Sequence, residues 1–158
     1  MGERTWPAKL LTVSDGVMAG TRHDRSGAAL AERLAGAGFE VAERRVTADG
    51  VEAVATALDE LTRDFAGLVV TTGGTGFGPR DLTPEGTRAV IEREAPGLAE
   101  AMRLVSPLGR LSRAVAGTVG QALVLNTPGS SKGAVETLDA VLDVVPHALD
   151  LLSGGRPH

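Results

Sequence analysis

The stretch from Thr71 to Asp81 holds the side chains and turns best suited to chemistry. Two threonines and three closely spaced glycines, Gly73, Gly74 and Gly76, follow an apolar run. Glycine tolerates positive φ and lets the backbone approach a ligand closely. Such a loop offers free backbone N–H groups that bind phosphate or another anion. The alternative is a simple turn, because the stretch lacks both the Lys-Ser/Thr ending of a P-loop and the glycine spacing of dinucleotide-binding loops.

Asp49 and Asp81 are the candidate metal ligands, since each follows a predicted strand. Magnesium prefers hard oxygen ligands, usually one or two carboxylates together with substrate phosphates. Two carboxylates beside a phosphate-binding loop are typical of magnesium-assisted phosphoryl or nucleotidyl transfer. The alternative is that each aspartate only caps a helix or a turn.

Two cations are candidates for contact with phosphate. Lys132 follows a second loop rich in glycine and hydroxyl groups, residues 126–133, and would act as a point charge. Arg113, beside Ser112 in a predicted β run, carries a forked guanidinium that can bind phosphate through two hydrogen bonds. The alternatives are a solvated lysine and an edge-strand arginine.

Other chemistries are disfavoured by residue type and spacing. The chain has no cysteine, which excludes disulfides, thiolate metal sites and a cysteine nucleophile. Its three histidines lack metal-ligand spacing and are predicted to be surface residues, and Ser130-Ser131 lacks the context of a nucleophilic serine. A net charge of −4 and an aromatic content of 3% disfavour nucleic acid as a partner.

The same composition suggests a cytoplasmic protein without a membrane span. The apolar runs are too short to cross a bilayer, and residues 1–7 have no apolar signal-peptide core. The length of 158 residues and a hydrophobic content of 42% suggest one domain, residues 1–158, with a sizeable core.

The elements that must position these side chains alternate between strand and helix. Apolar patterns predict strands over residues 8–14, 39–46 and 68–71, separated by helices that begin near residues 27 and 54. This alternation predicts an α/β fold: a three-layer sandwich with a mostly parallel central sheet flanked by helices. Thr83 is predicted to cap a helix whose first residue is Pro84.

The second half predicts further helices and a short β-hairpin. Helices are expected over residues 87–94, 98–105 and 135–145, and again over 149–152. Two β runs, residues 111–119 and 122–125, flank Gly120-Gln121 and form the predicted hairpin. Met102 is predicted to be a core residue.

Four polar clusters fall at the ends of predicted strands. Because ligands of parallel α/β sheets bind at the carboxyl ends of the strands, the clusters are expected to form one site. The clusters are Ser14-Asp15, Asp49, residues 72–81 and residues 126–132.

Residues 72–85 closely resemble the signature of the molybdopterin adenylyltransferases, the family of the MogA and MoaB proteins and the gephyrin G domain. The likeness covers nearly the whole chain in the right order. It includes Ser14-Asp15, Asp24-Arg25-Ser26-Gly27, Glu94-Ala95-Pro96-Gly97 with Met102-Arg103, Leu111-Ser112-Arg113 and Leu125-Asn126-Thr127-Pro128-Gly129.

The resemblance implies a molybdopterin-binding-like fold and a nucleotidyltransferase of molybdenum cofactor biosynthesis. Such enzymes bind molybdopterin and Mg-ATP, adenylylate the pterin's terminal phosphate and release pyrophosphate. The resemblance also implies a homotrimer with a molybdenum insertase as a partner. The alternative is a molybdopterin-binding carrier of the MoaB type without catalysis.

The resemblance also assigns roles to individual residues. Asp49 and Asp81 are implied as catalytic residues and as magnesium ligands. The implied substrate-binding residues are Ser14, Asp15, Thr72, Gly73, Gly74, Thr75, Gly76, Ser112, Arg113, Asn126, Pro128, Gly129, Ser130 and Lys132.

Overall fold

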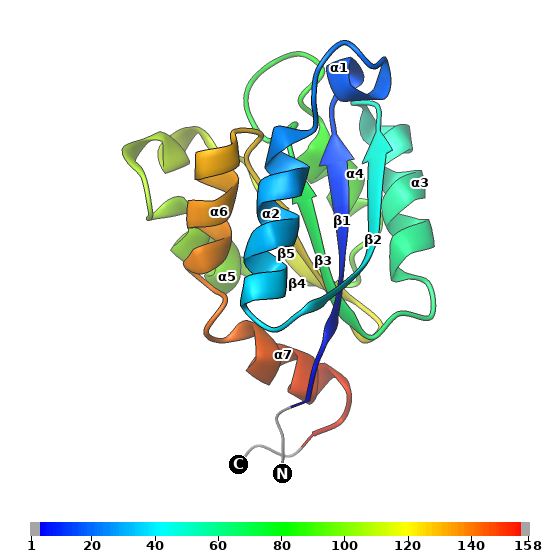
Figure 1. Ribbon diagram of the computed structural model, residues 1–158, viewed down its shortest axis with the longest axis vertical. Helices are drawn as coiled ribbons and strands as arrows, with labels where there is room; N and C mark the ends of the chain where they lie inside the picture. Colours follow the sequence, from blue (N-terminus) through cyan, green and yellow to red (C-terminus); the bar gives the residue numbers. More distant parts are fainter. Residues whose placement is uncertain (1–3, 156–158) are drawn as a thin grey trace.

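The computed structural model describes residues 4–155 and has three layers (Figure 1). A central sheet is covered by helices on both faces, which confirms the predicted fold class. The strands are β1 (Pro7–Val13), β2 (Glu40–Thr47), β3 (Gly67–Thr72), β4 (Arg93–Glu94), β5 (Ala116–Val119) and β6 (Ala122–Thr127). The helices are α1 (Asp15–Met18), α2 (Arg25–Gly36), α3 (Val51–Thr62), α4 (Thr83–Arg88), α5 (Pro96–Arg103), the 3-10 helix η1 (Pro107–Leu111), α6 (Ser131–Asp139) and α7 (Val145–Leu152).

The sheet has the strand order β2-β1-β3-β6-β5-β4. Strands β2, β1, β3 and β6 are parallel, whereas β5 runs antiparallel to β6 as the predicted hairpin and β4 runs antiparallel to β5. Every residue of β3 and β6 is buried, as expected for central strands covered on both faces. The carboxyl ends of β1, β3 and β6 therefore lie side by side at one edge of the sheet.

Each face of the sheet has its own apolar core, because successive side chains of a strand point to opposite faces. Leu10, Val70 and Leu125 pack with α2, α5, α6 and α7 on one face, and the predicted core residue Met102 lies there. Leu11 and Val69 pack on α3 on the other face. These cores fix the sheet against both helical layers.

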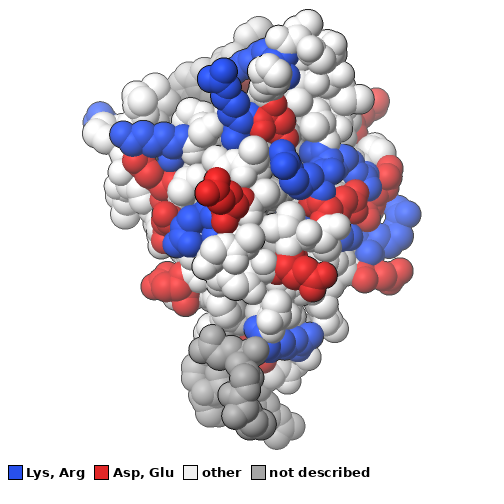
Figure 2. All heavy atoms as spheres, in the orientation of Figure 1, with Lys and Arg blue, Asp and Glu red and all other residues white. Residues whose placement is uncertain are grey.

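Charged side chains are interspersed over the face of the molecule that Figure 2 shows. Several of them pair, such as Arg33 of α2 and Asp139 of α6, whose Nε and Oδ1 atoms are 2.6 Å apart. Exposed pairs of this kind contribute about 0–1 kcal/mol each. The layers are therefore held together mainly by the two apolar cores.

Four local predictions are wrong. The helix expected over residues 135–145 is interrupted, because α6 ends at Asp139 and α7 begins only at Val145. Thr83 is the first residue of α4 rather than its N-cap, and its hydroxyl instead donates to the Gly73 carbonyl, at 2.9 Å. The helix predicted over residues 87–94 ends at Arg88, because residues 93–94 pair with β5. Ser112 and Arg113 precede β5 rather than belonging to it, since η1 occupies residues 107–111.

Two predictions reach beyond the described residues. Residues 1–3 of the predicted N-terminal segment, and His158 among the predicted surface histidines, lie outside residues 4–155. The single domain over residues 1–158 stays a prediction. Within the described range, none of the helices combines the length and apolarity that a membrane crossing requires.

Candidate active site

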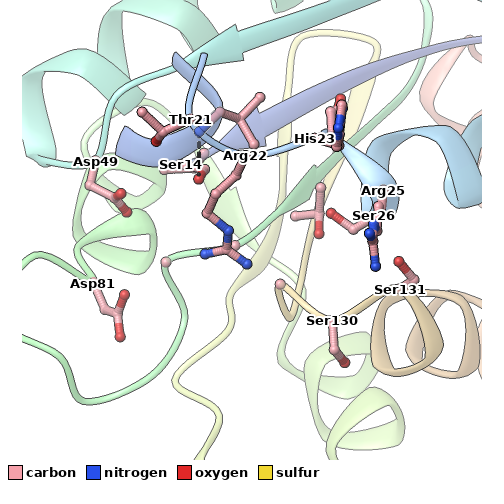
Figure 3. A pocket seen from close by; sticks show the side chains of 17 residues that line it. Ser14, Thr21, Arg22, His23, Arg25, Ser26, Asp49, Asp81, Ser130 and Ser131 are labelled. Carbon is pink, nitrogen blue, oxygen red and sulfur yellow. Dashed lines mark hydrogen bonds between the residues drawn. The ribbon is translucent and has the colours of Figure 1, made fainter. Parts of the chain in front are cut away.

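A cavity of about 750 Å³ lies at the carboxyl ends of the parallel strands. It is lined by Ser14 after β1, Asp49 after β2, residues 72–74 at the end of β3 and residues 129–131 after β6. Figure 3 shows the side chains of Ser14, Asp49, Ser130 and Ser131 around one opening, together with Asp81 from the loop that follows the glycines. The four predicted clusters therefore each contribute to the same cavity.

The glycine loop passes so close to its neighbours that a side chain has no room. Gly73 has a φ of 99°, and a Cβ atom there would lie 2.3 Å from the Val13 carbonyl oxygen. Gly74 has a φ of 70°, and its Cβ would lie 2.2 Å from the Thr83 hydroxyl oxygen. Both positions need glycine for conformation and for space. The loop therefore presents its backbone to the cavity.

A threonine joins the glycine loop to the second loop. The Thr72 hydroxyl donates a hydrogen bond to the Pro128 carbonyl, at 2.8 Å, and the Gly73 N–H donates to the Thr127 carbonyl, at 3.1 Å. These bonds fix the end of β3 against the end of β6. The Thr72 hydroxyl is therefore already hydrogen-bonded to the protein, although Thr72 lines the cavity.

Asp15 binds groups of the protein and does not line the cavity. The Asp15 N–H donates to Asp49 Oδ2, at 2.9 Å, and the Asp49 N–H donates to Asp15 Oδ1, at 3.1 Å. Arg80 donates to both Asp15 oxygens and, at 3.0 Å, to the Asp49 carbonyl. Hydrogen bonding to Arg80 holds the pKa of Asp15 below its usual range. The arrangement ties the loop that contains Arg80 to the ends of β1 and β2.

Asp49 and Asp81 are the carboxylates that face the cavity, and Figure 3 shows both on the same side of it. Partial burial raises the pKa of Asp49, and the nearby charges of Asp15 and Asp81 add to that effect. Asp81 Oδ2 accepts a hydrogen bond from the Gly78 N–H, at 2.9 Å, which orients its side chain. A cation beside the two carboxylates would offset their repulsion.

The donor set fits magnesium bound together with a substrate. Residues 4–155 contain no cluster of three or more side chains suited to hold a metal ion. Asp49 and Asp81 alone would supply two hard oxygen ligands and leave the remaining positions to water and phosphate. This is the usual composition of a magnesium site in enzymes that bind nucleotides.

Arg113, predicted to bind substrate, directs its donors to the protein. Its Nε donates to the Gly76 carbonyl, at 2.8 Å, its Nη1 contacts Glu85 Oε2 at 2.6 Å, and its Nη2 donates to the Asp81 carbonyl. Hydrogen bonding to Arg113 in turn lowers the pKa of Glu85. Arg113 thus holds the loop that contains Asp81, and it does not line the cavity.

Asn126 lies in the core behind the site and has no access to a ligand. Its Nδ2 donates to the hydroxyls of Thr71 and Thr87, both at 3.0 Å, and its Oδ1 accepts from the Val115 N–H, also at 3.0 Å. The side chain is fully buried. Asn126 therefore supports the ends of β3 and β6 from within.

The remaining predicted residues divide between two cavities and the surface. Ser112 and Pro128 line a smaller, more apolar cavity of about 160 Å³, which shares Ser130 with the larger one. Lys132 lines neither, because its side chain is 87% exposed and lies 3.8 Å from Glu136 one turn along α6. Thr75 and Gly76 also lie off both cavity walls.

The chain from α1 to the first turn of α2 supplies lining residues that the predicted set omits. Arg22 and Arg25 are exposed and line the larger cavity. Figure 3 shows the Arg22 side chain extending into the middle of the opening. Asp24-Arg25-Ser26-Gly27 is part of the resemblance, so this segment carried a signal, but nothing indicated the direction of Arg22. Other lining residues from this part of the chain are Val17, Thr21, His23, Asp24 and Ser26, and Ser131 of α6 also lines the cavity.

The electrostatics of the cavity suit a phosphate-bearing ligand and a cation. The amino termini of α2 and α6 lie at the wall of the cavity, where helix dipoles and free N–H groups favour anions. The glycine loop adds further backbone N–H groups. Fold and site together define an α/β domain with a cavity suited to a phosphorylated ligand at the carboxyl edge of its sheet.

The chain matches the family described as "Probable molybdopterin binding domain" over residues 9–147. It is 36% identical to the molybdopterin adenylyltransferase of Helicobacter pylori strain J99, over 92% of this chain and 86% of that protein. It is 33% identical to the molybdenum cofactor biosynthesis bifunctional protein of Chlorobaculum tepidum, over 92% of this chain but only 48% of that protein.

A solved structure extends the comparison to three dimensions. The molybdopterin biosynthesis enzyme MoaB of Thermus thermophilus is 47% identical and superposes with a TM-score of 0.89, over 95% of this chain and 98% of that one. The chain belongs to the family of molybdopterin-binding domains that includes the molybdopterin adenylyltransferases. Its part in molybdenum cofactor biosynthesis follows from that membership.

Proposed function

We propose that this protein is a molybdopterin adenylyltransferase that uses Mg-ATP. One observation carries the proposal: Asp49 and Asp81, from two separate loops, face one cavity beside a glycine loop and two helix amino termini. The H. pylori relative is named for the same reaction. Molybdopterin and ATP are thus the proposed substrates.

In the proposed reaction, a terminal phosphate oxygen of molybdopterin attacks the α-phosphorus of ATP. The bond between that phosphorus and the oxygen bridging to the β-phosphate breaks, and pyrophosphate leaves with the electron pair. Because the attacking group is already an anionic phosphate, the reaction needs no protein nucleophile. This requirement agrees with a chain that lacks cysteine.

The chain's own residues would bind and orient the two phosphate groups. The backbone N–H group of Gly74 and those of the first turns of α2 and α6 would bind phosphate oxygens. Asp49 and Asp81 would hold magnesium, which when bound neutralises charge on the transferring phosphates. Arg80 and Arg113 would keep those two carboxylates in place through the backbone contacts described above.

The decisive experiment compares Asp81→Asn with the parent protein. With molybdopterin, ATP and magnesium, the parent should form adenylylated molybdopterin and pyrophosphate in equal amounts. Asp81→Asn should lower kcat by roughly a hundredfold, the order of effect of losing one electrostatic contact at a transition state. Molybdopterin should still bind to the variant.

Asp143→Asn is the matched control, because Asp143 is an exposed aspartate that lies outside the cavity. An unchanged magnesium-dependent rate in Asp81→Asn would contradict the assignment of this residue. A parent protein that binds molybdopterin without forming product would instead favour the alternative of a non-catalytic carrier.

The proposal includes a cytoplasmic homotrimer that works with a molybdenum insertase. Exposed apolar side chains at Leu104 and Leu108 provide surface of the kind that subunit contacts cover. The C. tepidum relative is bifunctional, and the chain matches only about half of it. This supports a partner protein that supplies a second activity. Sedimentation equilibrium would report a stable monomer if the trimer is wrong.

A further inference from the structure

Arg22 presents a guanidinium group that no other group of residues 4–155 binds. Three neighbouring arginines are paired, Arg44 with Asp24, Arg80 with Asp15, and Arg113 with Glu85. Arg22 forms no hydrogen bond or ion pair through its side chain within the described residues, although it lines the cavity. Figure 3 shows it between Asp49 and Asp81 on one side and Ser130 and Ser131 on the other.

The backbone of Arg22 is held firmly while its head group is free. The Gly16 carbonyl accepts hydrogen bonds from the Thr21 N–H at 2.9 Å, from the Thr21 hydroxyl at 3.1 Å and from the Arg22 N–H at 3.2 Å. A Cβ atom on Gly16 would lie only 2.7 Å from Arg22 Cδ, so the aliphatic stem packs directly on this glycine. A cation anchored by its stem loses less conformational entropy when it binds a ligand.

The position of Arg22 selects one part of a nucleotide. The α-phosphate must lie near the carboxylates that would hold magnesium and near the attacking phosphate of the pterin. Arg22 extends into the same cavity, in space that is open to the rest of the triphosphate. A guanidinium binds phosphate oxygens through paired hydrogen bonds, and a pyrophosphate group carries several such oxygens.

We propose that Arg22 binds the pyrophosphate portion of the nucleoside triphosphate, both before and after the transfer. This inference rests on the proposed function, because it assumes that a triphosphate is the adenylyl donor. Arg22 would take the role for which the sequence suggested Lys132, whose side chain points away along α6. Arg25 lies at the first turn of α2, beside Ser131 in Figure 3, and is the natural cation for comparison.

Titration calorimetry with magnesium pyrophosphate tests the proposal on the full chain. Arg22→Gln should weaken pyrophosphate binding at least tenfold, and Arg22→Lys should recover part of that loss because it restores the charge without the fork. Arg22→Gln should leave the affinity for adenosine monophosphate within twofold, since that ligand lacks the β- and γ-phosphates. Arg93→Gln, an exposed arginine on β4 outside the cavity, is the control and should change neither affinity.

Three results would overturn the proposal. The parent protein could fail to bind magnesium pyrophosphate, Arg22→Gln could bind it as the parent does, or Arg22→Gln could lose monophosphate affinity as strongly as pyrophosphate affinity. A melt of each variant separates these results from unfolding.

The test is independent of turnover. A protein that binds pyrophosphate through Arg22 but forms no adenylylated product would refute the proposed reaction and support the role of Arg22. A protein that forms the product while Arg22→Gln keeps its pyrophosphate affinity would do the reverse.

Discussion

The larger cavity has an acidic wall, made of Asp49 and Asp81, and a basic wall, made of Arg22 and Arg25. On the acidic wall, both carboxylates accept backbone hydrogen bonds, Asp49 from the Asp15 N–H and Asp81 from the Gly78 N–H. On the basic wall, neither guanidinium has a partner within the part of the chain that the structure describes. The carboxylates of the acidic wall are thus hydrogen-bonded to the protein, whereas the guanidinium groups of the basic wall are left for a ligand to bind.

This difference suggests a division of labour. Carboxylates that are proposed to hold a metal ion need accurate placement before the ion arrives, and the loops of Asp49 and Asp81 are tied down by Arg80 and Arg113. Cations that bind a flexible polyphosphate can adjust when the ligand arrives, and a prior partner would only compete with it. The acidic wall is thus preorganised and the basic wall is adaptable.

The largest expected effect on stability comes from a substitution at Gly74, in the glycine loop beside the acidic wall. Gly74→Ala should lower the free energy of unfolding by about 3 kcal/mol, because a Cβ at this position meets the buried Thr83 hydroxyl and the residue has positive φ. The contact of this loop with α4 makes loss of stability the expected outcome.

Gly20→Ala is the matched control for Gly74→Ala. Gly20 has a similar φ of 77°, but nothing lies within 4 Å of its added Cβ. Urea unfolding should show a loss of about 1 kcal/mol, from the backbone conformation alone. Equal losses in the two variants would show that the acidic wall is no more tightly packed than an open loop.

An intermediate effect is expected when the tie between Arg113 and the Asp81 loop is cut. Arg113→Ala removes hydrogen bonds to the carbonyls of Gly76 and Asp81 and to Glu85, and should cost about 2 kcal/mol of unfolding free energy. Amide hydrogen exchange over residues 76–81 should accelerate. Arg113→Lys should rescue little, because one ammonium group cannot reproduce the fork.

Arg63→Ala serves as the control for Arg113→Ala, since Arg63 forms an exposed ion pair with Asp59. Its loss should be within about 0.5 kcal/mol. If exchange over residues 76–81 stays at the parent's rate in Arg113→Ala, the loop is rigid without this arginine and the comparison of the walls loses one of its supports.

The smallest expected effect is a difference in pH dependence between Asp15 and Asp49. The pKa of Asp15 is lowered on folding by Arg80, so its stabilising contribution is present above the usual aspartate pKa of about 3.9 and is lost as pH falls through the lower folded value. The pKa of Asp49 is raised on folding by burial. Its contribution is present below about 3.9 and is lost as pH rises through the higher folded value.

The two asparagine variants should therefore change the melting temperature in opposite directions at neutral pH. Asp15→Asn should lower Tm at pH 7, and its difference from the parent should shrink as pH falls below the usual aspartate value of about 3.9. Asp49→Asn should raise Tm at pH 7, because it removes a partly buried charge while keeping an acceptor for the Asp15 N–H. Melts of both variants between pH 3 and pH 7 check this, and a shift of the same sign would contradict it.

Much of the fold was predictable because its signals are local. Strands β1, β2 and β3 are short apolar or alternating runs, and α2 and α3 show apolar residues at helical spacing. The two-residue strand β4 gave no such signal, since it exists only through its pairing with β5. The same limit applied to Ser112 and Arg113, whose neighbours are set by η1 rather than by a β pattern.

By itself, the sequence determined the order of the parallel strands and of α2 and α3 between them, the family and the loops that meet at the site. Strand ends and glycine loops follow from residue types a few positions apart, so they can be read along the chain. Asn126 looked like a ligand-binding residue in the second loop. Its partners Thr71 and Thr87 are 55 and 39 residues away in the chain, and only folding made it a core residue.

The tertiary structure alone decided which charged side chains pair with one another within the protein. Arg80 is 65 residues from Asp15, and Arg113 is 28 residues from Glu85, so these pairs exist only once the sheet has formed. Lys132 points along α6 toward Glu136, whereas Arg22 extends into the cavity. A sequence specifies the type of each charged group, but the direction of a long side chain and the partners within its reach depend on the packing of distant elements.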